Sequence, residues 1–269
     1  MGIAFVKGHG TENDFVLLPD PDGRLSLTPE LVARICDRRA GIGGDGVLRV
    51  TPDTSGAAEW FMDYRNADGS VAEMCGNGVR VFARYLVSAG LTEPGDLVIA
   101  TRGGVKQVRA GLEGDVTVDM GIALFPDTDD IKVKVGDRSW SAVAVDMGNP
   151  HAVVLVDDLA DAGPLHEAPS VDPAFPHGVN VEFVSRLGDG HLAMRVHERG
   201  VGETRSCGTG ACAAMLVAAR RARAAPPTSY VVDVPGGRLT VTHREDDHVE
   251  LAGPAVLVAA GELSDSITG

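Results

Sequence analysis

Two cysteines in matching glycine-rich segments are the residues of this sequence with the clearest chemical potential. Cys75 lies in Met74–Gly78 and Cys207 in Ser206–Gly210; the cysteine and two glycines of each segment align at one common offset, close to half the length of the chain. An apolar run follows both segments, so we expect each thiol at the start of a helix, where free N–H groups and the helix dipole favour an anion. This setting predicts a lowered pKa for both thiols and thiolate near neutral pH.

Three chemistries use paired cysteines: disulfide exchange, metal binding, and proton transfer to opposite faces of one carbon. Exchange motifs keep their cysteines close in sequence, whereas Cys75 and Cys207 lie in different halves of the chain. Zinc sites need further ligands at suitable spacing, and the sequence has no Cys-x-x-Cys. Proton transfer needs two bases that face one substrate, which a protein with two related halves supplies.

A second pair of landmarks supports an internal duplication. Asn13 precedes an apolar strand-like run upstream of Cys75, and Asn149 precedes another at nearly the same separation upstream of Cys207. Matching landmarks in the same order favour duplication over coincidence.

The elements that must position these residues follow from local patterns. Helices are expected over Val79–Ala89 and Ala211–Ala219, and an amphipathic helix over Leu31–Arg39 after a Thr-Pro start. Gly8–Asp14 is expected to be a loop between two short strands, and Ala255–Ala260 a last strand that returns to the first half.

Composition limits the class of protein. The chain has 269 residues, 44% hydrophobic residues and 34 glycines, typical of a two-domain, strand-rich globular protein. A net charge of −14 without basic runs argues against nucleic-acid or anionic-membrane binding. The start of the chain does not resemble a signal peptide, and four scattered cysteines suggest reduced thiols, so we expect a cytoplasmic protein. Cys36 and Cys212 are expected to be buried and inert.

The sequence resembles the diaminopimelate epimerases, which interconvert LL- and meso-2,6-diaminopimelate without a cofactor, in lysine and cell-wall precursor biosynthesis. The motifs that carry the resemblance spread over nearly the whole chain in family order: Gly10–Phe15, Gly41–Gly46, Tyr64–Gly69, Met74–Arg80, Met147–His151, Val179–Val181 and Glu198–Ala213.

The resemblance implies an α/β (α+β) fold of two pseudo-symmetric lobes. Each lobe would be a curled, antiparallel-rich sheet around a central helix, with the active site in the cleft between the lobes. The N-terminal lobe would comprise 1–120, with 256–269 returning to it, and the C-terminal lobe 121–255. A homodimer is the expected assembly, and neither a metal nor a cofactor is expected.

The resemblance also assigns roles to particular residues. Cys75 and Cys207 would be the acid/base pair, and His151 and Glu198 would adjust the thiol pKa values. The residues that hold the substrate would be Asn13, Asn66, Gly76, Asn77, Asn149, Asn180, Glu198, Arg199, Gly208 and Thr209. Within this set, the first-turn donors Gly76, Asn77, Gly208 and Thr209 would face the reacting α-carboxylate, and Arg199 would pair with the distal one.

Two positions depart from the pattern or vary within it. Gly46 stands where some members carry glutamine, so one side-chain contact to the substrate is missing. Thr209 stands where serine is also found, which keeps the hydroxyl. No lysine lies in a motif, so nothing suggests a pyridoxal phosphate Schiff base; helix N-termini would stabilise the carbanionic intermediate instead.

Rival functions remain open at this stage. A proline-racemase-like enzyme would share the paired thiols but lack a clamp for a distal carboxylate; Arg199 and Asn180, to which the resemblance gives substrate-binding roles, argue against it. A cysteine–histidine hydrolase would use Cys75 with His151 and need only one cysteine. A non-catalytic binding protein would tolerate the loss of either thiol.

Overall fold

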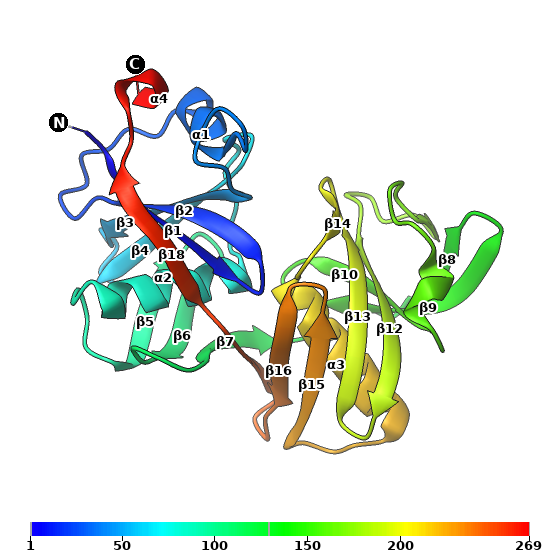
Figure 1. Cartoon of the computed structure of the whole chain (residues 1–269). Helices are drawn as coiled ribbons and strands as arrows, with labels where there is room; N and C mark the ends of the chain where they lie inside the picture. Colours follow the sequence, from blue (N-terminus) through cyan, green and yellow to red (C-terminus); the bar gives the residue numbers. More distant parts are fainter. Residues whose placement is uncertain (1, 129, 269) are drawn as a thin grey trace. The chain divides into compact units, whose positions relative to one another are not determined.

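The computed structural model describes residues 2–128 and 130–268, and the chain divides into two compact units (Figure 1). Unit 1 comprises Met1–Val118 and Gly253–Gly269, and unit 2 comprises Asp119–Ala252. Strands dominate both units and helices are few, so the predicted α+β class is confirmed. No helix among the described residues is both long and apolar enough to span a membrane.

Unit 1 is built from the two ends of the chain. Its elements are β1 (Ala4–Gly10), β2 (Asn13–Pro19), α1 (Pro29–Cys36), β3 (Gly46–Pro52), β4 (Trp60–Asn66), α2 (Gly76–Ser88), β5 (Gly95–Thr101), β6 (Gly104–Ala110), the first three residues of β7 (Val116–Ile122), β18 (Val256–Glu262) and α4 (Asp265–Thr268). β18 pairs antiparallel with β1, so the predicted return of the last strand to the first half is confirmed.

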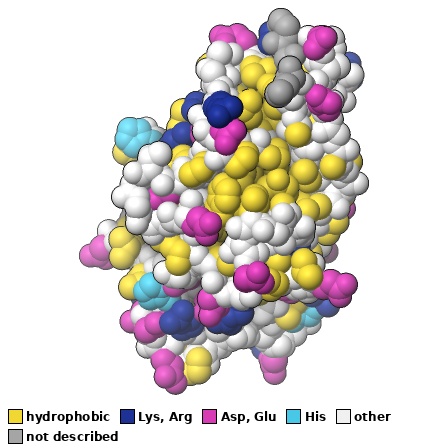
Figure 2. Space-filling view, turned by 90° about the vertical axis from the view of Figure 1, so that its left-hand side faces the viewer, with side chains coloured by type: hydrophobic (Ala, Val, Ile, Leu, Met, Phe, Trp, Pro, Cys, Tyr) yellow, Lys and Arg dark blue, Asp and Glu magenta, His cyan; other side chains and the backbone are white. Residues whose placement is uncertain are grey.

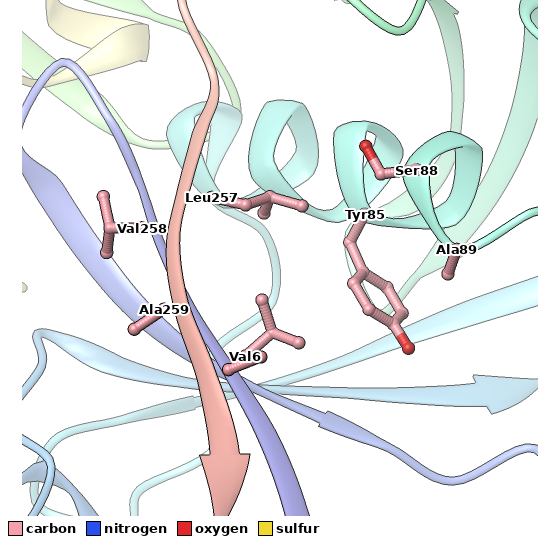
Figure 3. A pocket seen from close by; sticks show the side chains of 8 residues that line it. Val6, Tyr85, Ser88, Ala89, Leu257, Val258 and Ala259 are labelled. Carbon is pink, nitrogen blue, oxygen red and sulfur yellow. The ribbon is translucent and has the colours of Figure 1, made fainter.

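The outer side of β18 is apolar and exposed. Hydrophobic side chains gather on the face of the molecule shown in Figure 2. Between the end of α2 and β18 lies an open pocket of about 360 Å³, whose lining includes Tyr85 and Leu257 (Figure 3). The described residues that line this pocket include no cysteine and no charged side chain.

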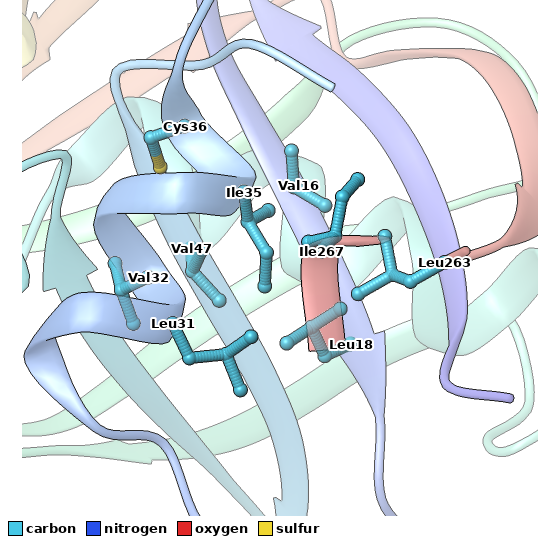
Figure 4. Packing of buried hydrophobic residues seen from close by; sticks show 9 residues of the cluster. All are labelled: Val16, Leu18, Leu31, Val32, Ile35, Cys36, Val47, Leu263 and Ile267. Carbon is cyan, nitrogen blue, oxygen red and sulfur yellow. The ribbon is translucent and has the colours of Figure 1, made fainter. Parts of the chain in front are cut away.

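Unit 1 has two apolar layers. α2 is the central helix: its residues are buried from Gly76 to Val87, and it contacts the six strands β1–β6 as well as β18. On the other side of the sheet, α1 and α4 pack over β2 and β3 (Figure 4). The residues of this second layer are Val16, Leu18, Leu31, Val32, Ile35, Cys36, Val47, Leu263 and Ile267.

Unit 2 contains η1 (Leu159–Ala162), a short 3₁₀ helix, and one long helix, α3 (Gly208–Ala222), which contacts strands on several sides. Its strands are β8 (Lys132–Val135), β9 (Arg138–Asp146), β10 (Pro150–Leu155), β11 (Ser170–Asp172), β12 (Asn180–Gly188), β13 (His191–Glu198), β14 (Gly202–Thr204), β15 (Thr228–Val234), β16 (Gly237–His243) and β17 (His248–Gly253).

The strand pairing of unit 1 recurs in unit 2. In unit 1 the β1–β2 hairpin is followed by the parallel pair β2–β3, the antiparallel pair β3–β4 and, after α2, the parallel pair β4–β5. In unit 2 the same order is given by β9–β10, β10–β12, β12–β13 and, after α3, β13–β15. The duplication predicted from the sequence is therefore present in the fold.

Two local predictions were wrong. β1 and β2 extend through most of the expected loop, so only Thr11 and Glu12 remain as the turn. The amphipathic helix ends at Cys36 instead of Arg39. Asp37 leaves the helix with ψ 122°, and its carboxylate accepts the N–H groups of Arg39 and Ala40, which gives the backbone an alternative to helical hydrogen bonds.

Candidate active site

Both cysteines cap the N-terminus of the central helix of their unit. Cys75 is the N-cap of α2 and Cys207 the N-cap of α3, each in extended conformation. The N–H of Gly78 donates to Sγ of Cys75 at 3.4 Å, and that of Gly210 donates to Sγ of Cys207 at 3.4 Å. The predicted placement of both thiols at helix N-termini is confirmed.

Asn13 lies beside Cys75 because of the β1–β2 turn. Thr11 and Glu12 adopt φ of 49° and 60°, the left-handed pair of a two-residue hairpin, although neither is glycine. Asn13 then starts β2 with its Oδ1 3.6 Å from Sγ of Cys75 and 3.1 Å from Nδ2 of Asn77. The turn thus brings three of the expected site residues together.

Asp45 holds the other end of the Asn13 amide. Its Oδ2 accepts from Nδ2 of Asn13 at 2.7 Å, while its Oδ1 lies 2.7 Å from Nη2 of Arg38. Arg38 also donates a hydrogen bond to Asp14. Burial alone would raise the pKa of the Asp14 carboxyl, but the hydrogen bonds and charges of Arg38 and Lys7 outweigh it and hold this pKa well below its usual range. Asp45 was missed as a positioning residue, although it lies in a matching motif.

Asn66 is the last residue of β4 and pairs with Gly46 of β3. Its Nδ2 donates to Oγ of Ser70 at 3.0 Å, and no described contact joins it to Cys75. A Cβ at Gly46 would lie 2.4 Å from the carbonyl oxygen of Arg65 and 2.7 Å from Cε2 of Tyr64. The backbone here therefore leaves no room for a side chain at position 46.

The environment of Cys207 contradicts the predicted lowering of its pKa. Burial raises the pKa of the Cys207 thiol well above its ordinary value, and the carboxylates of Glu198 and Glu182 raise it further. Hydrogen bonds from Thr209 and from the Gly210 N–H act in the opposite direction but are the smaller causes. These effects favour the protonated thiol of Cys207.

His151 is fully buried and both of its ring nitrogens are engaged within unit 2. Nδ1 lies 2.6 Å from Oε1 of Glu182, and Nε2 lies 3.1 Å from Oδ1 of Asn149. A histidine that serves as the base of a hydrolase needs an available ring nitrogen. This arrangement argues against the Cys75–His151 hydrolase.

The remaining expected residues of unit 2 lie near the ends of β12 and β13. Asn180, at the start of β12, is buried, and its Oδ1 accepts the backbone N–H of Arg199 at 2.9 Å. The Arg199 side chain is exposed and donates to the carbonyl oxygen of His177 at 3.1 Å. Glu198, the last residue of β13, accepts the hydroxyl of Thr204.

Each unit therefore assembles its own half of the expected set. Unit 1 brings together Asn13, Cys75, Gly76 and Asn77; unit 2 contributes Cys207, Gly208 and Thr209 at the start of α3, the pair Asn149 and His151, and the group Asn180, Glu198 and Arg199. Glu182 was missed in the sequence. A carboxylate within the apolar run of β12 was the available signal, because such a residue rarely lies buried without a partner.

The family model described as diaminopimelate epimerase matches residues 5–125 and 143–258. A diaminopimelate epimerase of Streptomyces coelicolor is 60% identical, over 98% of this chain and 96% of its own length. The diaminopimelate epimerase of Rhodococcus opacus is 48% identical, over 97% of this chain and 97% of its own length. That of Corynebacterium glutamicum is 49% identical, over 97% of this chain and 98% of its own length.

Solved structures of more distant proteins share the fold. A hydroxyproline epimerase from Agrobacterium vitis has a TM-score of 0.72 at 16% identity, covering 97% of this chain and 92% of its own. A phenazine biosynthesis protein of the PhzF family from Bacillus anthracis has a TM-score of 0.71 at 20% identity. The match covers 98% of this chain and 99% of that protein.

Proposed function

The chain belongs to the diaminopimelate epimerase family and is an enzyme that interconverts LL- and meso-2,6-diaminopimelate; we propose that it does so by two-base proton transfer between Cys75 and Cys207. The observation that carries this proposal is the N-cap position of both thiols on the two central helices. The reaction serves lysine and cell-wall precursor biosynthesis.

The two thiols take opposite roles in each direction of the reaction. In one direction the thiolate of Cys75 removes the α-hydrogen and the Cys207 thiol protonates the opposite face, in keeping with the raised pKa of Cys207. The roles exchange in the reverse direction. Each sulfur must then approach the α-carbon to about 3–3.5 Å, the near-attack range.

The charge that develops on the substrate must be stabilised without an electron sink such as pyridoxal phosphate. The first N–H groups of an α-helix have no intrahelical acceptor and face an anion favourably. We assign this role to the N–H groups of Gly76 and Asn77 in α2 and of Gly208 and Thr209 in α3, which would stabilise the enediolate form of the reacting carboxylate.

The polar side chains around the thiols would hold the rest of the substrate. Arg199 is exposed and carries a guanidinium suited to the distal carboxylate. Asn180 fixes the backbone of Arg199, which orients this clamp. Asn13, Asn66 and Asn149 would bind the amino and carboxylate groups, and Glu198, with His151, would adjust the Cys207 thiol. The open pocket beside β18 has no charged side chain among its described lining residues and does not suit a diamino diacid.

We propose the cytoplasm as the place of action. No disulfide joins the four described cysteines in this structure, and the two-base mechanism needs reduced Cys75 and Cys207. A reducing compartment maintains such thiols.

We also propose that the chain forms a homodimer through β18. Val256 and Val258 are 41% and 54% exposed in this strand, and Glu262 is its only charged residue. Two identical strands that meet antiparallel about a two-fold axis would bury the same residues from each copy. Sedimentation analysis should find a dimer that Val258→Arg dissociates and that Val143→Arg, in unit 2, leaves intact; a monomeric wild-type protein would exclude the dimer.

The decisive experiment follows the α-hydrogen of the substrate. Purified protein, without added cofactor, should incorporate deuterium from heavy water at the α-carbon of diaminopimelate while LL and meso forms interconvert. A cysteine–histidine hydrolase would give an acyl-enzyme and no exchange. Absence of exchange with diaminopimelate under reducing conditions would refute the proposed reaction.

A further inference from the structure

Different side chains lie beside the central helices α2 and α3 of the two units. Phe15 pairs with Gly46 across β2 and β3, and His151 pairs with Asn180 at the corresponding position of β10 and β12. Two residues further along, Leu48 therefore corresponds to Glu182. The apolar pair Phe15 and Leu48 of unit 1 is replaced in unit 2 by the polar pair His151 and Glu182.

Phe15 and Leu48 of unit 1 and Glu182 of unit 2 pack against the same helix position, the third residue of the first turn. A Cβ built on Gly78 would lie 3.4 Å from Cβ of Cys75, 3.4 Å from Cδ2 of Leu48 and 3.6 Å from Cζ of Phe15. A Cβ built on Gly210 would lie 3.3 Å from Cβ of Cys207 but only 2.8 Å from Oε1 of Glu182. The Glu182 carboxylate thus reaches the first turn of α3 because residue 210 has no side chain.

Glu182 lies in an unusual environment for a carboxylate. Its side chain is fully buried, Oε1 contacts Nδ1 of His151 at 2.6 Å, and Oε2 has no hydrogen-bond partner among the described residues. Burial of a carboxylate is costly unless it is paired and fully hydrogen-bonded, and unit 1 shows that leucine fits the corresponding position.

Building on the proposed two-base reaction, we propose that Glu182 is a positioning residue which orients His151 and keeps the proton on the Cys207 thiol in the free enzyme. Its contact with Nδ1 directs the other ring nitrogen of His151 toward Asn149. Its position beside Gly210 brings negative charge to the helix start that Cys207 caps.

The charges around Cys207 support this role. Burial is the largest cause of the raised pKa of Cys207, followed by Glu198 at the end of β13 and Glu182 in β12. The hydrogen bond with the Thr209 side chain lowers this pKa by a smaller amount. The helix N-terminus alone would favour thiolate. Glu182 is thus one of two carboxylates that oppose the helix dipole, and the corresponding Leu48 in unit 1 carries no charge.

The test is the pH dependence of alkylation of each cysteine, followed by peptide mass spectrometry in the free enzyme. Glu182→Gln keeps the shape and an oxygen for His151 but removes the charge. A lower pKa of Cys207 means more thiolate, so iodoacetamide should modify Cys207 about tenfold faster near neutral pH, with the pH midpoint of its profile shifted downward. Cys75 in the same chain is the internal reference, and its profile should not move.

Further variants separate charge from packing. Glu182→Leu, which places the unit 1 residue in unit 2, should shift the Cys207 profile in the same direction, and Glu250→Gln, a carboxylate elsewhere in unit 2, should shift nothing. For Glu182→Gln we expect a higher kcat with little change in KM in the direction where Cys207 removes the α-hydrogen, since a larger fraction of Cys207 is thiolate.

An unchanged Cys207 profile in Glu182→Gln would overturn this inference and leave the proposed reaction standing. If the profile shifts while the wild-type protein exchanges no α-hydrogen of diaminopimelate, the proposed reaction falls and the role of Glu182 toward the thiol remains.

Discussion

The Cys75 thiol points at the side-chain oxygen of Asn13, with Sγ and Oδ1 3.6 Å apart. The same oxygen accepts the side-chain N–H of Asn77, and Asp45 accepts from the amide nitrogen of Asn13. The orientation of the Asn13 amide is therefore fixed by partners on both sides, which leaves its oxygen toward the thiol.

Asn13→Asp should impair the reaction more than Asn13→Ala. The new carboxylate would lie against Asp45 and beside Cys75, where negative charge disfavours thiolate. The lost hydrogen bonds alone correspond to a decrease in kcat/KM of about 10- to 100-fold. Deuterium exchange measures the activity, and a melting curve shows whether the variant is folded. Wild-type kcat/KM in a folded Asn13→Asp protein would contradict the role given to Asn13.

Cys75→Ala and Cys207→Ala should each abolish epimerisation, because each face of the α-carbon needs its own proton carrier. The double variant should be hardly worse than either single one, since the residues act as a unit. Cys36→Ala and Cys212→Ala are matched controls: both thiols are buried, and burial raises the pKa of Cys36 to about 11. Their variants should stay active. A Cys207→Ala protein that epimerises normally in both directions would exclude the two-base mechanism.

Oxidation should inactivate the enzyme reversibly. The proposed mechanism brings both thiols to one carbon, so oxidant is expected to join Cys75 and Cys207 in a disulfide where substrate would bind. A thiol reductant should restore activity, and bound diaminopimelate should protect it. Peptide mapping after oxidation identifies the linkage; full activity in a sample whose Cys75 and Cys207 are both oxidised would contradict this expectation.

Gly46→Ala should destabilise unit 1. The added Cβ would lie 2.4 Å from the carbonyl oxygen of Arg65 on the paired strand, and such overpacking costs about 1–3 kcal/mol. Gly188→Ala is the control, because nothing lies within 4 Å of a Cβ there. Urea denaturation should show a lower midpoint for Gly46→Ala alone. Equal midpoints would mean that the β3–β4 pair can accept a side chain at this position.

Arg199→Met should raise KM for diaminopimelate, since the distal carboxylate loses its charged partner. Hydrogen bonds to charged groups contribute about 1.5–3 kcal/mol, so a KM increase of about 10- to 100-fold is expected, with a smaller effect on kcat. Arg186→Met removes an exposed arginine that pairs with Asp189 and should leave KM unchanged. A normal KM in Arg199→Met would assign the distal carboxylate to another residue.

Features encoded by adjacent residues were predictable from the sequence. A cysteine before a glycine-rich turn and an apolar run was enough to predict both N-caps, and the spacing of Asn13 and Asn149 predicted the duplication. These patterns depend on hydrogen bonds within a few residues. The family resemblance supplied the remaining candidate residues.

Features that depend on strand register were not predictable. The contact between His151 and Glu182 exists because β10 and β12 pair with His151 opposite Asn180. The pKa of Cys207 was predicted in the wrong direction for the same reason: the helix start is visible in the local sequence, whereas burial and the carboxylates of β12 and β13 come from tertiary packing.

The pairing of β18 with β1 also has a consequence for synthesis on the ribosome. β1 is among the first segments to be made, but its partner strand belongs to the last residues of the chain, so unit 2 is complete before unit 1 can close. Domains generally fold as units during synthesis, N-terminal first. Here that order is inverted, because one edge of β1 stays unpaired until β18 has been synthesised. A chain that stops before Val256 would contain all the strands of unit 2 but would lack the strand that completes unit 1.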